Sequence, residues 1–510
     1  MRLLHDFLER TARRVPDKIA LVTTGQRFTY AQIESDAARL ARALRARGVA
    51  RGDRVAIFAD NGVEVVVGIF ATLKAGAVFM PVNSLTKGDK LAYLLNDSRA
   101  SCLVTTQALR EIWEHALAGS ESVSACIVSG LPARDGNGRL SSYEAALADD
   151  SQELETSSTI DQDLASIIYT SGSTGEPKGV MLTHLNMVSA AQSVNGYLGI
   201  TGEDVILCAL PLAFDYGLYQ ILMGFLVGAT VVLERSFSFP VKVLQTAASE
   251  GVTVFPGVPT MFSMIMSLGN LAQFDLSRLR MITNTAAALS ERHIRELREL
   301  FPQATLFSMY GLTECKRVTY LPPPELDVRP TSVGRGMPNE EVWLVDEHGK
   351  RLPNGSTGEL VIRGSNVMRG YWEKPEQTAR RLKPGPYPGE MVLYSGDIFR
   401  TDEEGYLYFV ARKDDIIKSR GEKVSPKEVE NVLYALDGVQ DAAVVGVPDE
   451  VLGQAIKAYV VLRSGCRHSE KDVLRHCQGR LESFMVPKHV AIVGELPKTD
   501  TGKIKKTGLS

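Results

Sequence analysis

The densest group of residues suited to chemistry lies between Thr170 and Gly179, which read Thr-Ser-Gly-Ser-Thr-Gly-Glu-Pro-Lys-Gly directly after the apolar run 165–168. Glycines let backbone N–H groups approach an anion closely, hydroxyls donate further hydrogen bonds, and Lys178 adds a positive charge. The spacing is not that of a Walker A loop, which needs four residues between its glycines and then Gly-Lys-Ser or Gly-Lys-Thr. The segment therefore predicts a phosphate-binding turn between a strand and a helix, with a polar loop that binds nothing as the alternative.

Two hydrophobic periods indicate which elements must carry this loop. A helical period marks one face of the segment 33–44, which Gly48 ends, and short apolar runs recur between similar helical patterns. We expect strands at 54–59, 77–82, 165–168, 205–209, 229–233, 252–255, 279–283 and 304–307. Strands spaced by helices of this length are joined by crossovers, which predicts a largely parallel sheet. The similar helix-Gly-Ala-strand stretches at 71–82 and 224–233 indicate two related layers.

The pattern changes after residue 330. Frequent glycines separate short alternating strands such as 359–363, which predicts a compact antiparallel β unit. After a charged segment at 412–423, an α+β pattern runs to the end, with helices at 426–436 and 470–481 and strands at 442–447, 456–462 and 489–493. We therefore expect an α/β protein with two domains. The N-terminal domain, 1–411, combines parallel α/β layers (1–330) with a small β unit (331–411), and a small α+β C-terminal domain covers 412–510.

Composition narrows the class of protein. The chain has 510 residues, of which 44% are hydrophobic and 23% charged, which excludes a disordered chain and leaves enough apolar material for a large core. With 57 Lys and Arg against 60 Asp and Glu, the net charge of -3 favours neither a nucleic acid nor a membrane as a partner. The most apolar stretch, 218–233, is interrupted by Gln220 and two glycines, so it is not expected to span a membrane. Six scattered cysteines and an N-terminus without a signal-peptide pattern lead us to expect a cytoplasmic protein.

Five further motifs follow the glycine-rich loop along the chain. They are Tyr-Gly-Leu-Thr-Glu at 310–314, Gly-Glu-Leu…Gly-Tyr-Trp at 358–372, Tyr-Ser-Gly-Asp…Arg at 394–400, Arg-Lys-Asp-Asp-Ile-Ile-Lys-Ser-Arg-Gly at 412–421 and Pro-Lys-Thr-Asp-Thr-Gly-Lys at 497–503. In content and order, the six motifs resemble the signature motifs of the adenylate-forming superfamily, which comprises acyl- and aryl-CoA synthetases, amino-acid adenylation enzymes and luciferases. The resemblance covers the chain from end to end.

This resemblance implies that a carboxylate attacks the α-phosphorus of ATP, in the presence of Mg²⁺, to form an acyl-adenylate and release pyrophosphate. Both reactants are anionic, so positioning and charge neutralisation should dominate catalysis. The implied catalytic residues are Lys503, which bridges the carboxylate and phosphate oxygens, Thr313, which bonds the α-phosphate, and Glu314, which holds Mg²⁺ through carboxylate oxygen.

The resemblance also assigns the nucleotide site. Tyr310 is expected to stack on adenine opposite the small surface 286–288, and Asp397 is expected to accept hydrogen bonds from both ribose hydroxyls beside Arg412. The residues implied to bind ATP or AMP are Thr170, Ser171, Gly172, Ser173, Thr174, Gly175, Lys178, Ala286, Ala287, Ala288, Tyr310, Gly311, Asp397 and Arg412.

A second half-reaction is implied as well, in which a thiol attacks the adenylate and forms a thioester. Asp414 matches the hinge position of the family, so the C-terminal domain is expected to be mobile and to rotate about it. Rotation would withdraw Lys503 and present the segment from Lys418 to Gly421, whose glycine leaves room for a pantetheine arm. The thiol belongs to coenzyme A or, as the alternative, to the phosphopantetheine of a separate carrier protein.

The substrate pocket departs from a common pattern of the family. Many acyl- and aryl-CoA synthetases have Pro-Leu-Phe-His-x-x-Gly where this chain has Pro-Leu-Ala-Phe-Asp-Tyr-Gly at 211–217. The Phe-Asp pair resembles amino-acid adenylation domains, which leads to the hypothesis that Asp215 pairs with an amino group of the acid. The alternative is that Asp215 caps a helix that starts near Tyr216. The candidate pocket residues are Phe214, Asp215, Tyr216, Tyr219, Asn284 and Thr285.

The basic pair Lys316-Arg317, two residues after Glu314, either meets a second anionic group or balances Glu314. Taken together, the motifs predict an AMP-forming acid–thiol ligase that activates a carboxylic acid, amino- and aryl-substituted acids included, and passes the acyl group to coenzyme A. The alternatives are a stand-alone amino-acid adenylation enzyme that loads a carrier protein, and a non-catalytic relative that only binds nucleotide. Glu314, Asp397 and Lys503 are all of the reactive type, which argues against the non-catalytic alternative.

Overall fold

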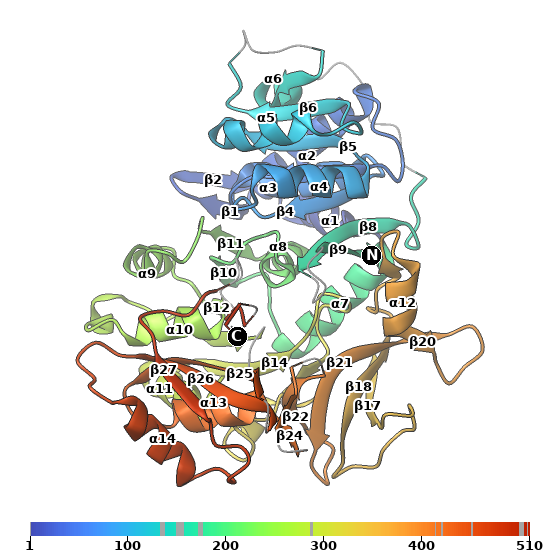
Figure 1. Ribbon diagram of the computed structural model, residues 1–510. Coiled ribbons are helices and arrows are strands. Elements are labelled where there is room, and N and C mark those ends of the chain that lie inside the picture. The colour runs from blue at the N-terminus through green and yellow to red at the C-terminus, as the bar shows by residue number, and fades with distance from the viewer. Residues whose placement is uncertain are drawn as a thin grey trace.

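The structure is a computed structural model, and it describes residues 2–132, 138–148, 158–171, 177–285, 289–413, 415–419, 422–449, 452–498, 504–506 and 508–509. Two large sheets with helices on their faces form the N-terminal part, and two smaller sheets follow (Figure 1). Within the described ranges, no helix combines the length and the apolar character that crossing a bilayer requires.

The first large sheet has eight strands in the order β19-β9-β8-β4-β3-β5-β6-β7. Its strands from β8 to β7 pair in parallel, whereas β9 pairs antiparallel with β8 and with β19. The strands are β3 (Arg54–Phe58), β4 (Val78–Val82), β5 (Ala100–Thr106), β6 (Ala125–Ser129), β7 (Leu140–Ser142), β8 (Leu164–Ser171), β9 (Pro177–Thr183) and β19 (Gly370–Tyr371). The helices along this part of the chain are α2 (Tyr30–Ala46), α3 (Val63–Lys74), α4 (Gly88–Ser98), α5 (Arg110–Ala118), α6 (Tyr143–Ala148) and α7 (His184–Leu198).

The second large sheet has nine strands in the order β16-β15-β14-β13-β12-β10-β11-β1-β2, and those from β14 to β1 are parallel. The strands are β1 (Ile19–Thr23), β2 (Gln26–Thr29), β10 (Val205–Cys208), β11 (Thr230–Leu233), β12 (Val254–Gly257), β13 (Met281–Asn284), β14 (Thr305–Tyr310), β15 (Thr319–Tyr320) and β16 (Arg335–Gly336). The helices of this layer are α1 (Asp6–Arg14), α8 (Asp215–Val227), α9 (Pro240–Ser249), α10 (Pro259–Met266) and α11 (Glu291–Leu300).

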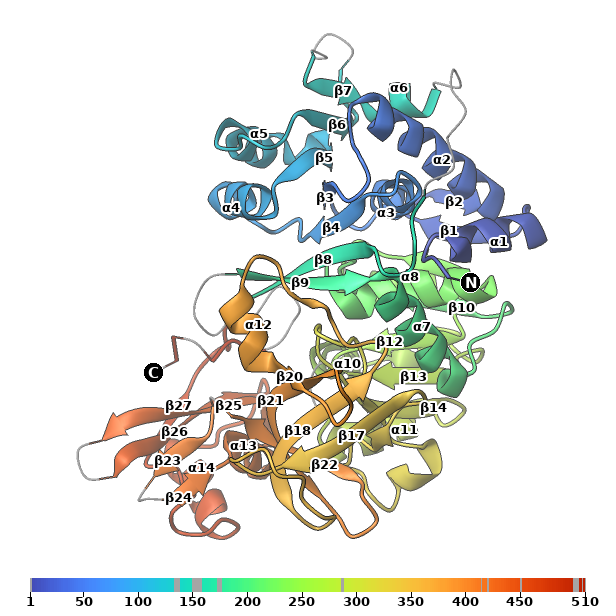
Figure 2. The same cartoon turned by 90° about the vertical axis from the view of Figure 1, so that its right-hand side faces the viewer.

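Helices α3 and α8 join the two sheets through one apolar core. Each helix is followed by Gly-Ala and a strand, and the rings of Phe70 and Phe225 stack across the layer with centroids 5.4 Å apart. Both rings are fully buried, as is expected where two sheets share one hydrophobic layer. Figure 2 shows α7 and α8 lying between the β8–β9 ribbon and the strands β10, β12 and β13. The two similar helix-strand stretches expected from the sequence thus belong to two related layers.

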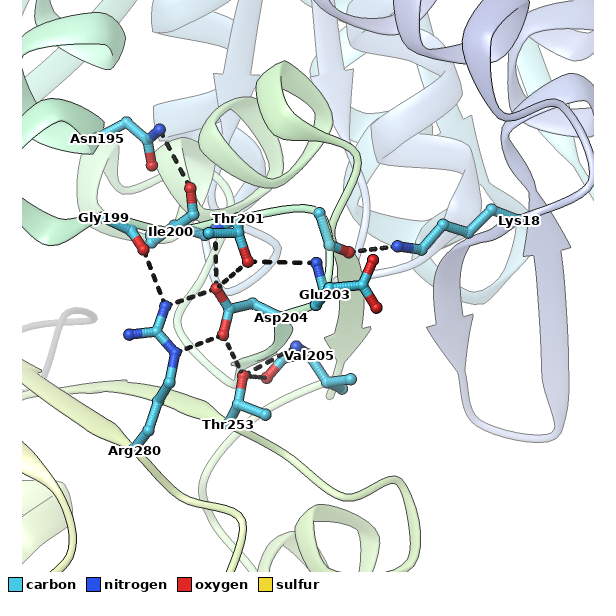
Figure 3. Close-up of polar contacts among 11 residues, drawn as sticks. Lys18, Asn195, Gly199, Ile200, Thr201, Glu203, Asp204, Val205, Thr253 and Arg280 are labelled. Atoms are coloured by element: carbon cyan, nitrogen blue, oxygen red, sulfur yellow. Dashed lines mark hydrogen bonds and ion pairs between the residues drawn. The ribbon is translucent and has the colours of Figure 1, made fainter.

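An ion pair between the buried Asp204 and the exposed Arg280 links the amino-terminal ends of β10, β12 and β13 (Figure 3). Arg280 binds both carboxylate oxygens of Asp204, at 2.7 Å through Nε and at 2.6 Å through Nη2, and Thr253 donates its hydroxyl to the same carboxylate at 2.7 Å. Bidentate arginine–carboxylate pairs combine charge with fixed geometry. This network therefore sets the register of the central strands, whose opposite ends carry the functional residues.

The smaller sheets complete the chain. One consists of β17 (Glu340–Val345), β18 (Thr357–Gly364), β20 (Leu382–Pro384), β21 (Met391–Thr401) and β22 (Leu407–Arg412), with α12 (Pro375–Arg381) beside it. The other consists of β23 (Ile417–Ser419), β24 (Glu422–Val424), β25 (Val439–Asp449), β26 (Gly453–Leu462) and β27 (His489–Ile492), with α13 (Pro426–Tyr434) and α14 (Glu470–Gln478). The change from one sheet to the other falls between Arg412 and Ile417, next to the boundary predicted at 411/412.

Candidate active site

The glycine-rich loop connects two strands. Thr170 and Ser171 end β8, and their Cα partners in the antiparallel β9 are Lys178 and Pro177. The prediction of a strand-to-helix turn is therefore wrong, because residues 177–183 continue as a strand and α7 begins only at His184, behind a capping box formed by Thr183 and Asn186. Antiparallel pairing right up to Ser171 holds the two ends of the loop together. The loop residues Gly172, Ser173, Thr174 and Gly175 lie outside the described residues.

Tyr371 links the end of this hairpin to Glu314. Its phenol donates a 2.7 Å hydrogen bond to Oε1 of Glu314, and the ammonium nitrogen of Lys178 lies 5.7 Å from the centre of its ring. Burial, followed by the nearby Glu314 carboxylate, raises the pKa of Tyr371, so the phenol keeps its proton. Tyr371 belongs to the Gly-Glu-Leu…Gly-Tyr-Trp motif, but its position in the sequence indicates no role for it. Only its contacts identify it as a positioning residue for Glu314.

The turn after β14 presents Glu314 through several backbone contacts. The carbonyl of Glu314 accepts a 2.7 Å hydrogen bond from the backbone N–H of Met368. Gly311 packs so closely that a Cβ atom there would lie 2.3 Å from the carbonyl oxygen of Lys316, which explains why this position has no side chain. The amide of Asn366 donates to the carbonyls of Cys315 and Arg317, at 2.7 and 3.1 Å. These contacts fold residues 311–317 into a fixed turn at the carboxyl end of β14.

The predicted nucleotide residues Tyr310, Asp397 and Arg412 are brought together at this same end. The phenol of Tyr310 donates a 2.5 Å hydrogen bond to Oδ2 of Asp397, and its ring packs edge-on against Phe399 with centroids 4.8 Å apart. Nε of Arg412 lies 3.7 Å from Oδ1 of Asp397. Burial raises the pKa of Asp397, which Arg412 opposes. One carboxylate oxygen is thus already engaged by Tyr310, and stacking of that ring on adenine stays a prediction.

Residues 286–288, the expected opposite wall for adenine, lie outside the described residues. The strand before them is β13, which ends at Asn284 and pairs with both β12 and β14. Asn284 and the following Thr285 are buried. In open α/β sheets, ligands bind at the carboxyl ends of the strands, and the ends of β8, β13 and β14 are where the predicted residues gather.

The predicted pocket residue Asp215 already has a cationic partner within the chain. Oδ2 of Asp215 lies 3.6 Å from Nζ of Lys316, and the same ammonium donates a 2.9 Å hydrogen bond to the carbonyl of Asp215. Helix α8 begins at Asp215 with Phe214 as its N-cap, so the alternative that Asp215 caps the helix is wrong. Lys316 therefore balances Asp215, and the suggestion that it balances Glu314 does not hold.

Aromatic rings surround this ion pair. The ammonium of Lys316 lies 4.2 Å from the ring centre of Tyr219 and 5.5 Å from that of Tyr216. The phenol of Tyr216 is itself bonded to Thr283, at 2.6 Å to its hydroxyl and 2.8 Å to its carbonyl. Burial lowers the pKa of Lys316 to about 7, while Asp215 opposes that shift. The structure thus brings the predicted pocket residues Asp215, Tyr216 and Tyr219 of α8 into one buried cluster with Lys316 and with Thr283 of β13.

The C-terminal domain contacts the N-terminal domain at α11 and β22. Nη1 of Arg292 lies 3.6 Å from Oδ1 of Asp437, and the hydroxyl of Ser425 donates a 2.5 Å hydrogen bond to the carbonyl of Val410. The lysine loop is closed by an antiparallel bridge between Lys498 and Ile504. The predicted residues Asp414, Gly421 and Lys503 lie outside the described residues, and Lys418 forms part of the backbone of β23.

The comparisons with known proteins agree with this arrangement. Residues 8–372 match the family model of the AMP-binding enzymes, and residues 428–503 match the C-terminal domain model of the same enzymes. The chain is 36% identical to a feruloyl-CoA synthase of an Amycolatopsis species over 98% of this chain and 96% of that protein.

Two solved structures are similar over nearly the whole chain. An anthranilate CoA ligase in complex with anthranoyl-AMP superposes with a TM-score of 0.91 at 28% identity, covering 99% of this chain and 96% of that one. The ATP-bound MatB of Rhodopseudomonas palustris superposes with a TM-score of 0.88 at 30% identity, covering 100% and 98%. The chain therefore belongs to the AMP-binding enzyme family, and it is an ATP-dependent, AMP-forming acyl-CoA ligase that uses ATP, Mg²⁺ and coenzyme A.

Proposed function

We propose that this ligase activates a carboxylic acid that carries no amino group beside the reacting carboxylate, and transfers its acyl group to coenzyme A. The observation that carries the proposal is the buried contact between Asp215 and Lys316. An ammonium group at Asp215 would meet Nζ of Lys316, and while that amine is protonated, like charges about 4 Å apart repel by about 4 kcal/mol at an effective dielectric constant of about 20. Asp215 is therefore not available to select an amino acid.

The residues around Glu314 fit a Mg²⁺ ion bound together with a triphosphate. The phenol of Tyr371 donates a hydrogen bond to Oε1 of Glu314, and the backbone N–H of Met368 donates to the carbonyl of Glu314. Glu314 therefore presents its other carboxylate oxygen in a defined direction. Mg²⁺ is commonly held by one or two carboxylates plus substrate phosphates, and when bound it neutralises charge on the phosphate oxygens. Glu314 would hold the ion.

The chain's own residues then account for the first half-reaction. Lys178 and the glycine-rich loop bind phosphate oxygens, Thr313 bonds the α-phosphate, and Asp397 with Arg412 orients the ribose. A carboxylate oxygen of the acid attacks the α-phosphorus, the bond to the pyrophosphate oxygen breaks, and Lys503 steadies the charge on the oxygens between them.

In the second half-reaction, the thiolate of coenzyme A attacks the acyl carbon and AMP leaves. For this step we infer that the C-terminal domain rotates about Asp414, which withdraws Lys503 and presents the segment 418–421 to the pantetheine arm. The contacts of Arg292 with Asp437 and of Ser425 with Val410 hold one arrangement of the domains, and rotation would have to break them.

The proposal is tested by pyrophosphate exchange and thioester formation with matched acids, such as propionate against alanine and 3-phenylpropionate against phenylalanine. We expect at least about a tenfold higher kcat/KM for the acid without the amino group, because one pair of like charges costs more than the 1.4 kcal/mol that corresponds to tenfold. Asp215→Asn should leave that ratio unchanged. A wild-type preference for amino acids that disappears in Asp215→Asn would refute the proposal, and thioester formed only on a holo carrier protein would refute the acceptor.

A further inference from the structure

Arg317 is a buried cation next to the predicted acid pocket. Its side chain is among the largest fully buried ones, with 1% of the residue exposed. The central carbon of its guanidinium lies 5.1 Å from the ring centre of Tyr216. The ammonium of Lys316 lies 5.5 Å from the centre of the same ring. Arginine is always protonated, so this group carries its charge into the interior.

Within the described part of the chain, no carboxylate lies close enough to form an ion pair with Arg317, and its Nε has no hydrogen-bond partner. The carboxylate of Asp215 is engaged by Lys316. The half-buried Glu340 also lies near this turn, but its carboxyl group accepts a hydrogen bond from Asn366 at 3.4 Å. Burial raises the pKa of Glu340 well above its ordinary value, which favours the neutral acid. Lys316, Arg317 and Asp215 therefore form a cluster with two cations and one anion.

A buried guanidinium without an anion is costly, and a cation–π contact with one tyrosine ring compensates only part of that cost. The backbone of the same turn is strained, because Lys316 adopts φ +71°, a conformation that residues other than glycine rarely take. Strain and unpaired charge at the same turn are typical of sites that a ligand completes. The missing partner is an anion.

The position of the cluster beside the predicted acid pocket indicates that the substrate supplies that anion. Arg317 follows Glu314 by three residues, so its Cα is at most about 11 Å from that of the residue assigned to the metal and the triphosphate. Its aromatic neighbour Tyr216 is a pocket residue of α8, and the phenol of Tyr216 is already bonded to Thr283. Because Lys316 is engaged by Asp215, the strong donor left for a substrate in this wall of the pocket is the guanidinium of Arg317.

We propose that Arg317 binds a second carboxylate of the substrate, so that the acid activated by this ligase is a short dicarboxylic acid. The planar guanidinium matches a carboxylate through two parallel hydrogen bonds, which gives both affinity and orientation. This inference rests on the proposed function, because it places the acyl group beside α8 and β13. It adds the chemical class of the acid and a residue that selects it.

The test compares acids of equal chain length that differ only in the second carboxylate: butyrate against succinate, and pentanoate against glutarate, in pyrophosphate exchange with the full-length enzyme. We expect the wild type to favour the dicarboxylate by about 10- to 100-fold in kcat/KM, the range that hydrogen bonds between charged groups support. Arg317→Met should remove most of that preference by slowing the dicarboxylate while leaving the monocarboxylate within about twofold. Arg317→Lys should keep part of the preference, because the charge remains and the fork geometry is lost.

The exposed Arg351, which lies over Trp343 on the outer β sheet, provides the matched control Arg351→Met, with both acids expected at wild-type rates. A wild-type enzyme that prefers the monocarboxylates overturns the inference even if the variants do not fold. Equal loss of both acids in a folded Arg317→Met enzyme also overturns it. Other results would refute the proposed function itself, namely a preference for amino acids or a thioester that forms only on a carrier protein. Added chloride or sulfate that protects the wild type, but not Arg317→Met, against thermal unfolding would support an anion site.

Discussion

The hydrogen bond from Tyr371 to Glu314 gives the sharpest test of the catalytic geometry. Tyr371→Phe removes only the phenolic oxygen and leaves the ring beside Lys178, so it isolates the 2.7 Å contact with Oε1 of Glu314. A hydrogen bond to a charged group contributes about 1.5–3 kcal/mol. Tyr371 is buried but Glu314 is half-buried, so water can replace part of the hydrogen bond in the variant. We therefore expect a loss of about 1.5 kcal/mol of transition-state stabilisation, the lower end of that range.

An energy of about 1.4 kcal/mol corresponds to a factor of ten. We therefore expect Tyr371→Phe to lower kcat/KM for adenylation about tenfold and to raise the Mg²⁺ concentration needed for half-maximal pyrophosphate exchange, because Glu314 loses the contact that orients it. Exchange is measured at fixed ATP and acid across a Mg²⁺ titration.

Thioester formation from a supplied acyl-adenylate does not involve pyrophosphate or a triphosphate-bound ion, so it should stay within about twofold of the wild type in Tyr371→Phe. Tyr387 is an exposed tyrosine whose ring lies under Arg363, and Tyr387→Phe is the matched control. An unchanged Mg²⁺ dependence in Tyr371→Phe would show that Glu314 is oriented without this phenol. Equal loss of both half-reactions would point to a structural defect in place of a catalytic one.

Two further predictions concern the amino-terminal ends of the strands β10, β12 and β13, and the C-terminal domain. Burial raises the pKa of Asp204, but the hydrogen bonds of Arg280, Thr201 and Thr253 outweigh it and leave that pKa below its ordinary value, so the pair stabilises the fold above pH about 4 and less as the pH falls further. Asp204→Asn should therefore cost about 1.5–3 kcal/mol in urea unfolding at pH 7, because the buried carboxylate loses its charged hydrogen bonds while the exposed Arg280 returns to water. The variant should show a flatter dependence of stability on pH between 6 and 3, whereas a wild-type slope would contradict the assignment. Lys503→Ala should abolish pyrophosphate exchange while sparing thioester formation from a supplied adenylate, and loss of both would argue against two domain arrangements.

The sequence alone determined most of the regular elements of this protein. The strands expected at 54–59, 77–82 and 205–209 appear as β3, β4 and β10 with ends shifted by at most one residue, because short apolar runs between helical periods have few other ways to be buried. The motifs also placed Glu314, Tyr310 and Asp397 in one reaction before any fold was known. The strand β9 was missed, because Pro177 and Gly179 at its start are unusual in a strand, although β9 pairs along its whole length with β8.

Only the tertiary structure decided which charges are already paired. Asp215 and Lys316 are 101 residues apart, and Tyr371 and Glu314 are 57 apart, so no local period or spacing relates them. These pairs form because the order of strands in two sheets brings the start of α8, the turn after β14 and β19 to a common edge. A carboxylate in a sequence shows only that it needs a partner once buried. Whether that partner is a substrate or another side chain depends on packing between distant segments.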